Sequence, residues 1–180
     1  MGPTETVRPR SSRAIAVAVA SCCAVALVAV VAGGAGAVTA LRAAAVCALV
    51  VALVWAGYWR PCVEVSDGGV LLVDPWRTVH VPWPALDSVS DRWSLTLTTS
   101  DGRRFSAFAA PAGGAAQRGS GPARQAADLV LERRDALREA GFLEDLRPEG
   151  APVTVRLARG PVLVCAGTLV LAAALLALPL

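Results

Sequence analysis

The sequence contains no lysine, because all seventeen of its basic residues are arginines. A P-loop, a kinase-type phosphate site and a Schiff-base mechanism each need a lysine amine, so the composition excludes these chemistries. Histidine is nearly as scarce, since His80 is the only one. A catalytic triad or a metal site built on His80 would need partners that the sequence does not supply, so a solvated or edge-packed imidazole is the simpler interpretation.

Cysteine occurs at five positions, but none of the spacings is typical of metal ligands. Cys62 follows the second of three apolar runs, and the other four lie inside such runs: Cys22, Cys23, Cys47 and Cys165. We expect these side chains to act as small buried hydrophobic groups. The sequence therefore predicts a protein that is not an enzyme, with no catalytic residue, no cofactor and no metal.

More than half of the residues, 55%, are hydrophobic, and they are concentrated in three runs. Residues 14–59 as a single helix would extend roughly 69 Å, more than twice the hydrocarbon thickness of about 30 Å. We therefore predict two transmembrane helices, about 14–32 and 41–59, and a third at 161–180. The turn between the first two is expected near Gly33 to Arg42, where glycine disfavours helix and arginine is costly in lipid.

The placement of arginine indicates the direction of these spans. The tail, residues 1–13, carries three arginines, whereas the first loop has only Arg42; three more arginines flank the central region at Arg60, Arg156 and Arg159. The positive-inside rule places the tail and the central region in the cytoplasm. Abundant Ala and Val without lysine is typical of a bacterial gene of high GC content, so the predicted location is a bacterial cell membrane, with several passes.

A second interpretation of the N-terminus stays open. Val19-Ala20-Ser21-Cys22 resembles a lipoprotein cleavage box after a charged tail and a short apolar core. The apolar run continues to Ala32, however, whereas a mature lipoprotein usually begins with polar residues. The sequence does not decide whether Cys22 is lipidated, and either interpretation leaves the central region in the cytoplasm.

The region from Arg60 to Ala110 has the period of β-strands. Val63 and Val65 alternate with polar residues, and the glycines of Asp67-Gly68-Gly69 suit a tight turn. Further alternating or short apolar stretches lie at 70–73, 79–81, 95–98 and 104–109, with a weaker one around Val89. The spacing predicts four or five short antiparallel strands with one apolar face.

The segment after these strands predicts a linker and a helix. Residues 111–121 are rich in Gly, Ala, Pro and Ser, as flexible linkers are. A helix is expected at 122–140, with proline near its start and Gly141 after its end. Its apolar positions would cover the open face of the sheet: Ala126, Leu129, Val130, Leu137 and Ala140. Residues 144–160 are expected to connect to the last span, with 153–157 as one more strand.

The segment Arg77-Thr-Val-His-Val-Pro-Trp83, a later Asp101-Gly102 hairpin and a closing helix resemble a bacterial pleckstrin-homology-like (PH-like) domain. The resemblance is to the low-molecular-weight protein antigen 6 type, common in actinobacterial membrane proteins with neighbouring transmembrane helices. It covers roughly residues 59–111 and extends through the helix to 140. It implies a bent barrel or split sheet capped by a helix, hence an α+β membrane protein with a PH-like domain at 60–143. Four or five strands are fewer than the seven of a full barrel, which would make this barrel incomplete.

The predicted function is a cytoplasmic module for protein–protein interaction or scaffolding, held in the lipid bilayer and binding an unidentified protein. No nucleic-acid partner and no small-molecule substrate are predicted. The candidate interaction surface consists of Trp76, Arg77, His80, Trp83 and Trp93. For the tryptophans, packing in the core or at the membrane edge is the alternative.

Two rival functions stay open. Direct binding of anionic lipid headgroups would need concentrated positive charge, but residues 60–159 contain thirteen arginines and thirteen acidic residues. A membrane enzyme that used Asp74 or Asp91 would need these carboxylates to converge in a pocket.

Small residues recur on the first two spans. Ala44, Ala48, Ala52 and Ala56 lie four residues apart on the second span, and Ala16, Ala20 and Ala24 do so on the first. Stripes of this kind allow helix backbones to approach closely in lipid. We predict that the two spans pack as a hairpin through these stripes, although such stripes also arise by chance in Ala-rich helices.

Overall fold

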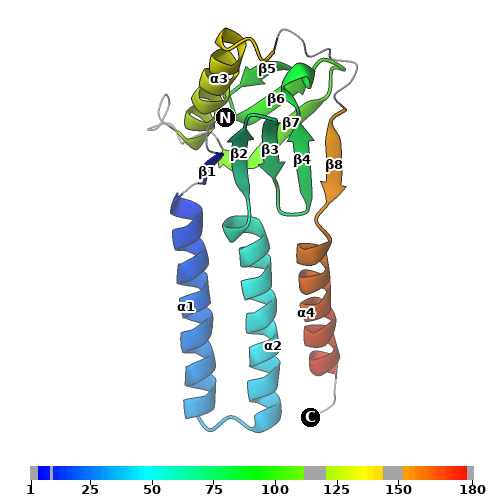
Figure 1. Cartoon of the computed structure of the whole chain (residues 1–180). Helices are drawn as coiled ribbons and strands as arrows, with labels where there is room; N and C mark the ends of the chain where they lie inside the picture. The colour runs from blue at the N-terminus through cyan, green and yellow to red at the C-terminus, as the bar shows by residue number, and fades with distance from the viewer. Residues whose placement is uncertain (1–3, 9, 112–120, 144–151, 178–180) are drawn as a thin grey trace. The chain divides into compact units, whose positions relative to one another are not determined.

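The computed structural model describes residues 4–8, 10–111, 121–143 and 152–177. The chain divides into two compact units (Figure 1): residues 1–9 with 61–157, and residues 10–60 with 158–180. We call the first the β module and the second the helical unit. The predicted mixed α+β class is confirmed, since the chain has antiparallel sheets together with three helices long and apolar enough to cross a membrane.

Three long helices build the helical unit. They are α1 (Arg10–Ala32), α2 (Ala37–Val54), which continues as one π-helical turn η1 (Trp55–Trp59), and α4 (Arg159–Ala177). The chain turns at 33–36, where Gly34 has a φ of +72°, so Arg42 lies inside α2 and not in the turn as predicted. Its charge is accommodated by a distant contact: Arg42 Nε donates a hydrogen bond to the Leu175 carbonyl oxygen at 2.9 Å, near the end of α4, where helix carbonyls lack partners within the helix.

The helices of this unit contact one another through small side chains. Helix α2 packs against both α1 and α4, and the Cys47 thiol donates to the Cys23 carbonyl oxygen of α1 at 3.7 Å. Near the start of α1, the Arg13 guanidinium lies over the Trp59 ring, 5.3 Å from the centroid of that ring. Large apolar side chains point outward along all three helices, as expected of helices whose solvent is lipid: Val25, Val28, Leu53, Leu163 and Val170 are examples.

The first sheet of the β module, sheet A, has five antiparallel strands in the order β1-β2-β3-β4-β8. They are β1 (Glu5–Val7), β2 (Cys62–Ser66), β3 (Gly69–Val73), β4 (Arg77–Val81) and β8 (Thr154–Leu157). The prediction that residues 1–13 form only a tail is therefore wrong for residues 5–7, which pair with β2. At the opposite edge, β8 lies within the predicted 153–157 strand and pairs with β4.

The second sheet, sheet B, has three antiparallel strands in the order β5-β6-β7. They are β5 (Leu86–Ser90), β6 (Ser94–Thr99) and β7 (Arg104–Pro111), and a short 3-10 turn η2 (Trp83–Ala85) leads into them. The weak stretch around Val89 is thus a full strand. The described residues contain eight strands in two sheets. Six of them, β2 to β7, lie in the region where four or five were expected; β8 matches the strand predicted at 153–157, and β1 was not predicted.

The core of the module lies between the two sheets and beneath helix α3 (Pro122–Glu139). Alternate valines and leucines of both sheets point inward and are fully buried, Val63, Val79, Leu72, Leu95 and Leu97 among them. Helix α3 contacts β7, β2 and β6 through a face that includes Ala126 and Val130, as predicted, whereas Ala140 is exposed. Of the predicted linker 111–121, residues 112–120 lie outside the described residues, as does 144–151 of the predicted connector.

Candidate interaction surface on the outer face of sheet A

The outer face of sheet A carries one row of side chains across all five strands. The register pairs Thr6 with Glu64, Glu64 with Leu71, Leu71 with His80 and His80 with Thr154. Directly opposed residues point to the same face of a sheet. A second row on the same face lies two residues away along each strand, and it consists of Cys62, Val73, Thr78 and Arg156. The sheet thus gathers, on one face, side chains separated by almost the whole chain.

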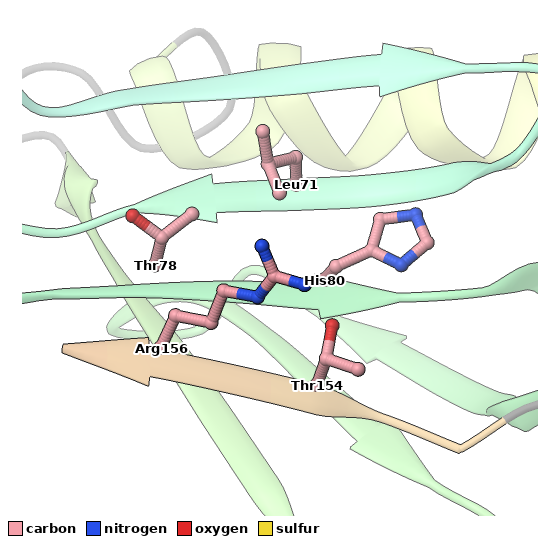
Figure 2. A pocket seen from close by; sticks show the side chains of 5 residues that line it. All are labelled: Leu71, Thr78, His80, Thr154 and Arg156. Carbon is pink, nitrogen blue, oxygen red and sulfur yellow. The ribbon is translucent and has the colours of Figure 1, made fainter. Parts of the chain in front are cut away.

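A shallow depression of about 320 Å³ lies where these rows cross β3, β4 and β8. Its lining residues are Leu71, Thr78, His80, Thr154 and Arg156. Figure 2 shows the Arg156 side chain reaching from β8 across β4, so that its guanidinium lies between Thr78 and His80. Pockets for small molecules range from about 300 to 1,000 Å³ and are mostly apolar, so this depression is small for a substrate and unusually polar.

The chemistry of the depression favours an acidic group. Arg156 supplies a fixed fork of N–H donors suited to a carboxylate, two threonine hydroxyls can donate alongside it, and His80 adds an imidazole. Leu71 is the one apolar lining residue, and no carboxylate lines the depression. A single acidic side chain of a partner therefore fits the surface in both size and charge.

Strand β8 borders the depression and forms one edge of sheet A. All four of its residues are exposed, whereas β1 at the opposite edge contacts α3. An edge strand presents a row of backbone N–H and C=O groups to which an extended segment can add. Val155 and Leu157, on the other face of β8, are 50% and 65% exposed, so apolar side chains flank the same edge.

The five residues predicted as an interaction surface are distributed over different parts of the module. His80 is half-buried in the depression. Trp76 and Arg77 lie at the turn between β3 and β4 and are exposed, and Arg77 Nε is 2.9 Å from the Asp74 carboxylate. Trp93, at the β5–β6 turn, is 81% exposed. Of these residues only His80 lines the depression, and its neighbour Arg156 was not predicted because its strand pairs across a separation of about 75 residues.

Trp83 is a correction to that predicted surface, because its side chain is buried in the core of the module. Its indole N–H donates to the Ser66 carbonyl oxygen at 3.0 Å, which satisfies the one polar atom of the ring. Beside this hydrogen bond, the backbone of Gly69 lies close to the backbone of Val81. Glycine is required at position 69, because its φ is +138° and a Cβ there would lie 2.4 Å from the Val81 carbonyl oxygen. Core packing, the alternative considered for the tryptophans, applies to Trp83.

Asp74 has a structural role that accounts for its burial. One carboxylate oxygen, Oδ2, accepts a hydrogen bond from Arg77 Nε, and the other, Oδ1, accepts from the Phe108 backbone N–H of β7 at 2.9 Å. The carboxylate therefore joins sheet A to sheet B. Asp91 lies at the β5–β6 turn and does not line the depression, so these two carboxylates do not converge there.

The cysteines and the carboxylates offer little to a metal. Within the described ranges, no group of three His, Cys, Asp or Glu side chains has a geometry that could hold an ion, and the five cysteines are free thiols. Burial raises the pKa of the Cys62 thiol, with the nearby Arg8 opposing the shift. A neutral thiol of this kind is a poor nucleophile.

The alanine stripe of α2 packs in a different way from the prediction. Ala52 and Ala56 are buried in a cluster with Cys165 of α4, whereas Ala44 is half-buried and Ala48 is exposed. On α1, Ala16 is buried but Ala20 and Ala24 are exposed. The two helices do contact each other, yet the buried part of the stripe on α2 also serves its contact with α4.

Comparison with known proteins gives no family for this chain: no family model matches it, and neither does any curated protein or solved structure.

Proposed function

We propose that the chain is a multi-pass membrane protein whose β module is PH-like and binds another protein through the β8 edge and the adjoining depression. The partner contributes an extended segment that adds to β8 and places an acidic side chain against Arg156. The observation that carries this proposal is the coincidence of a fully exposed edge strand with a donor-rich depression beside it.

Pairing within sheet A supports the proposed membrane topology. Residues 5–7 pair with β2, so they lie on the same side of a membrane as residues 62–66. An even number of crossings must therefore separate them, which agrees with α1 and α2 forming a hairpin. Helix α4 then leaves from the same side after β8. The positive-inside rule favours the cytoplasm for this side, and the composition, rich in Ala and Val and without lysine, supports a bacterial cell membrane as the proposed location.

The strand order supports a PH-like interpretation. Strands β2, β3 and β4 follow one another in sheet A, β5, β6 and β7 follow one another in sheet B, and α3 comes next and packs on β7, β2 and β6. A split antiparallel sheet closed by a following helix is the arrangement that the resemblance implies. In this proposal β1 and β8 are additions that come from the segments next to the membrane helices.

A protein partner is favoured over a lipid headgroup by the distribution of charge. The depression contains one arginine and one histidine, and the module as a whole has twelve arginines against fourteen acidic residues, whereas headgroup sites concentrate several cations. The open backbone edge of β8 and the exposed Val155 and Leu157 have no role in binding a phosphate. They are the features that an added strand would use.

The test is site-specific photocrosslinking of the full-length protein in its native membranes. A photoreactive amino acid at Thr154, in the depression, should yield a protein adduct. The same probe at Ser88, an exposed position of sheet B, is the matched control and should not. Arg156→Glu should lower the yield at position 154 by about tenfold, which corresponds to about 1.4 kcal/mol, because it replaces an attraction to the acidic side chain by a repulsion. Arg92→Glu, at an exposed turn, should leave the yield unchanged.

Identification of the adduct then decides between the partners. The proposal requires the crosslinked segment to contain an acidic residue whose replacement by arginine restores binding to the Arg156→Glu variant. Adducts with lipid alone would support the binding of lipid headgroups and contradict the proposed protein partner. Equal yields at positions 154 and 88, or a yield indifferent to Arg156→Glu, would show that this surface is not the binding site.

A further inference from the structure

One end of sheet A holds every connection between the β module and the long helices. Strand β1 ends at Val7, β2 begins at Cys62, and β8 ends at Leu157. In the register these positions lie together, since Val7 pairs with Val63, Cys62 with Val73, and Leu157 with Arg77. The turn between β3 and β4, which contains Trp76, lies at this same end. The opposite end is formed by the β2–β3 turn around Gly68.

The connections at this end are very short. Two residues separate β1 from α1, two separate η1 from β2, and one separates β8 from α4. Even a fully extended connection of two residues spans at most about 11 Å between the flanking Cα atoms. Each of these three strand ends can therefore lie no farther than about 11 Å from the end of a helix that we propose to cross the bilayer. A large side chain at this end of the sheet is within reach of the headgroup layer, which is several ångströms thick on each side of the hydrocarbon core.

Trp76 has the properties of an interfacial side chain. It is 44% exposed although it is one of the largest apolar groups of the module. Its position is fixed, because Asp74 on one side and Arg77 on the other are joined by an ion pair and by a backbone hydrogen bond from Asp74 N–H to the Arg77 carbonyl oxygen, both at 2.9 Å. Indole rings favour the boundary between hydrocarbon and water, and the exposed Arg8 at the same end can contact lipid phosphates.

We propose that the β3–β4 turn inserts Trp76 into the headgroup layer and thereby holds the β module upright on the bilayer, with the β2–β3 turn pointing away. The partner of this surface is the lipid bilayer itself, and no specific headgroup is required. The observation behind it, the position of Trp76 among the three connections, is independent of the protein partner proposed above.

The test uses the full-length protein, labelled with 5-fluorotryptophan, in nanodiscs whose lipids carry a nitroxide on the headgroup. Trp76→Phe identifies the fluorine resonance of Trp76. The matched control is Gly68→Trp, which places an indole at the opposite end of the same sheet; Gly68 is exposed, and the nearest atom to a Cβ there is Ser66 Oγ at 3.9 Å. An unchanged Trp83 resonance shows that the control variant keeps its core.

We expect the Trp76 resonance to be broadened roughly tenfold more than the resonance at position 68, because a strand of five residues separates the turns by about 16 Å and the broadening falls steeply with distance. Equal broadening of the two resonances would mean that the module lies on its side or tumbles, and it would overturn the proposal. So would a Trp76 resonance that stays sharp.

Discussion

The β module and the helical unit bury opposite kinds of side chain. The largest fully buried side chains of the described residues all belong to the module, among them Leu72, Leu95 and Leu97. The helical unit buries small residues, such as Ala45, Ala56 and Cys165, and exposes its valines and leucines. The same amino acids thus serve two solvents: in the module they escape water, and in the helices they are available to lipid.

The largest expected effect follows from truncating the same residue type in each unit. Leu97→Ala should lower the free energy of unfolding of the module by about 2–5 kcal/mol, because it opens a cavity in a fully buried site. Leu169→Ala, at a 55% exposed position of α4, should change it by less than about 0.5 kcal/mol. Urea unfolding of the full-length protein in nanodiscs, followed by tryptophan fluorescence, measures both. If both variants lowered the free energy of unfolding by similar amounts, the two units would not differ in the way described.

Removing the Asp74 carboxylate is the next largest change. Asp74→Ala leaves the Phe108 N–H and the Arg77 guanidinium without this acceptor, and it should cost about 1–3 kcal/mol in the same urea experiment. Asp87→Ala, an exposed position of β5, is the control and should be close to neutral. A neutral effect at Asp74 would mean that the two sheets do not depend on this bridge.

Strand β1 provides a smaller test of where the module ends. Val7 is 8% exposed and belongs to the module core, so Val7→Ala should destabilise the module by about 1.5 kcal/mol, from the loss of two buried methyl groups. Thr6→Ala, on the exposed side of the same strand, should have almost no effect. Equal stability of the two variants would contradict the assignment of Val7 to the core of the module.

The smallest effect concerns acid and the turn from β6 to β7. Hydrogen bonds from the Thr99 hydroxyl and the Arg103 backbone N–H lower the pKa of Asp101 below its ordinary value of 3.8. Because the folded pKa is the lower one, the stabilisation is present above the unfolded pKa and is lost as the pH falls through the folded value. Asp101→Asn should therefore be less stable than the wild type at neutral pH and should approach it below about pH 4. Parallel stability curves would contradict this assignment.

Local patterns predicted much of this fold, and distant pairings limited the rest. Alternating or short apolar stretches predicted the bounds of β2, β3, β4 and β6 to within a residue or two. Pro122 near the start and Gly141 after the end predicted the bounds of α3. Strand β1 has three residues, too few for a period. Strand β8 was predicted at 153–157, but its pairing with β4 was not. Each of these two strands pairs with a partner far along the chain. The candidate site depended on β8, which explains why His80 was singled out from the sequence but Arg156 was not.

The three-residue strand at the start of the chain links folding to insertion. Val7 can complete the edge of sheet A only when both ends of the α1–α2 hairpin emerge on one side of the bilayer. A chain in which only one of these two helices crossed would leave residues 5–7 and β2 on opposite sides of the bilayer, with β2 as an open edge. The pairing of β1 with β2 therefore forms only in a chain whose first two helices have both inserted or have both stayed out.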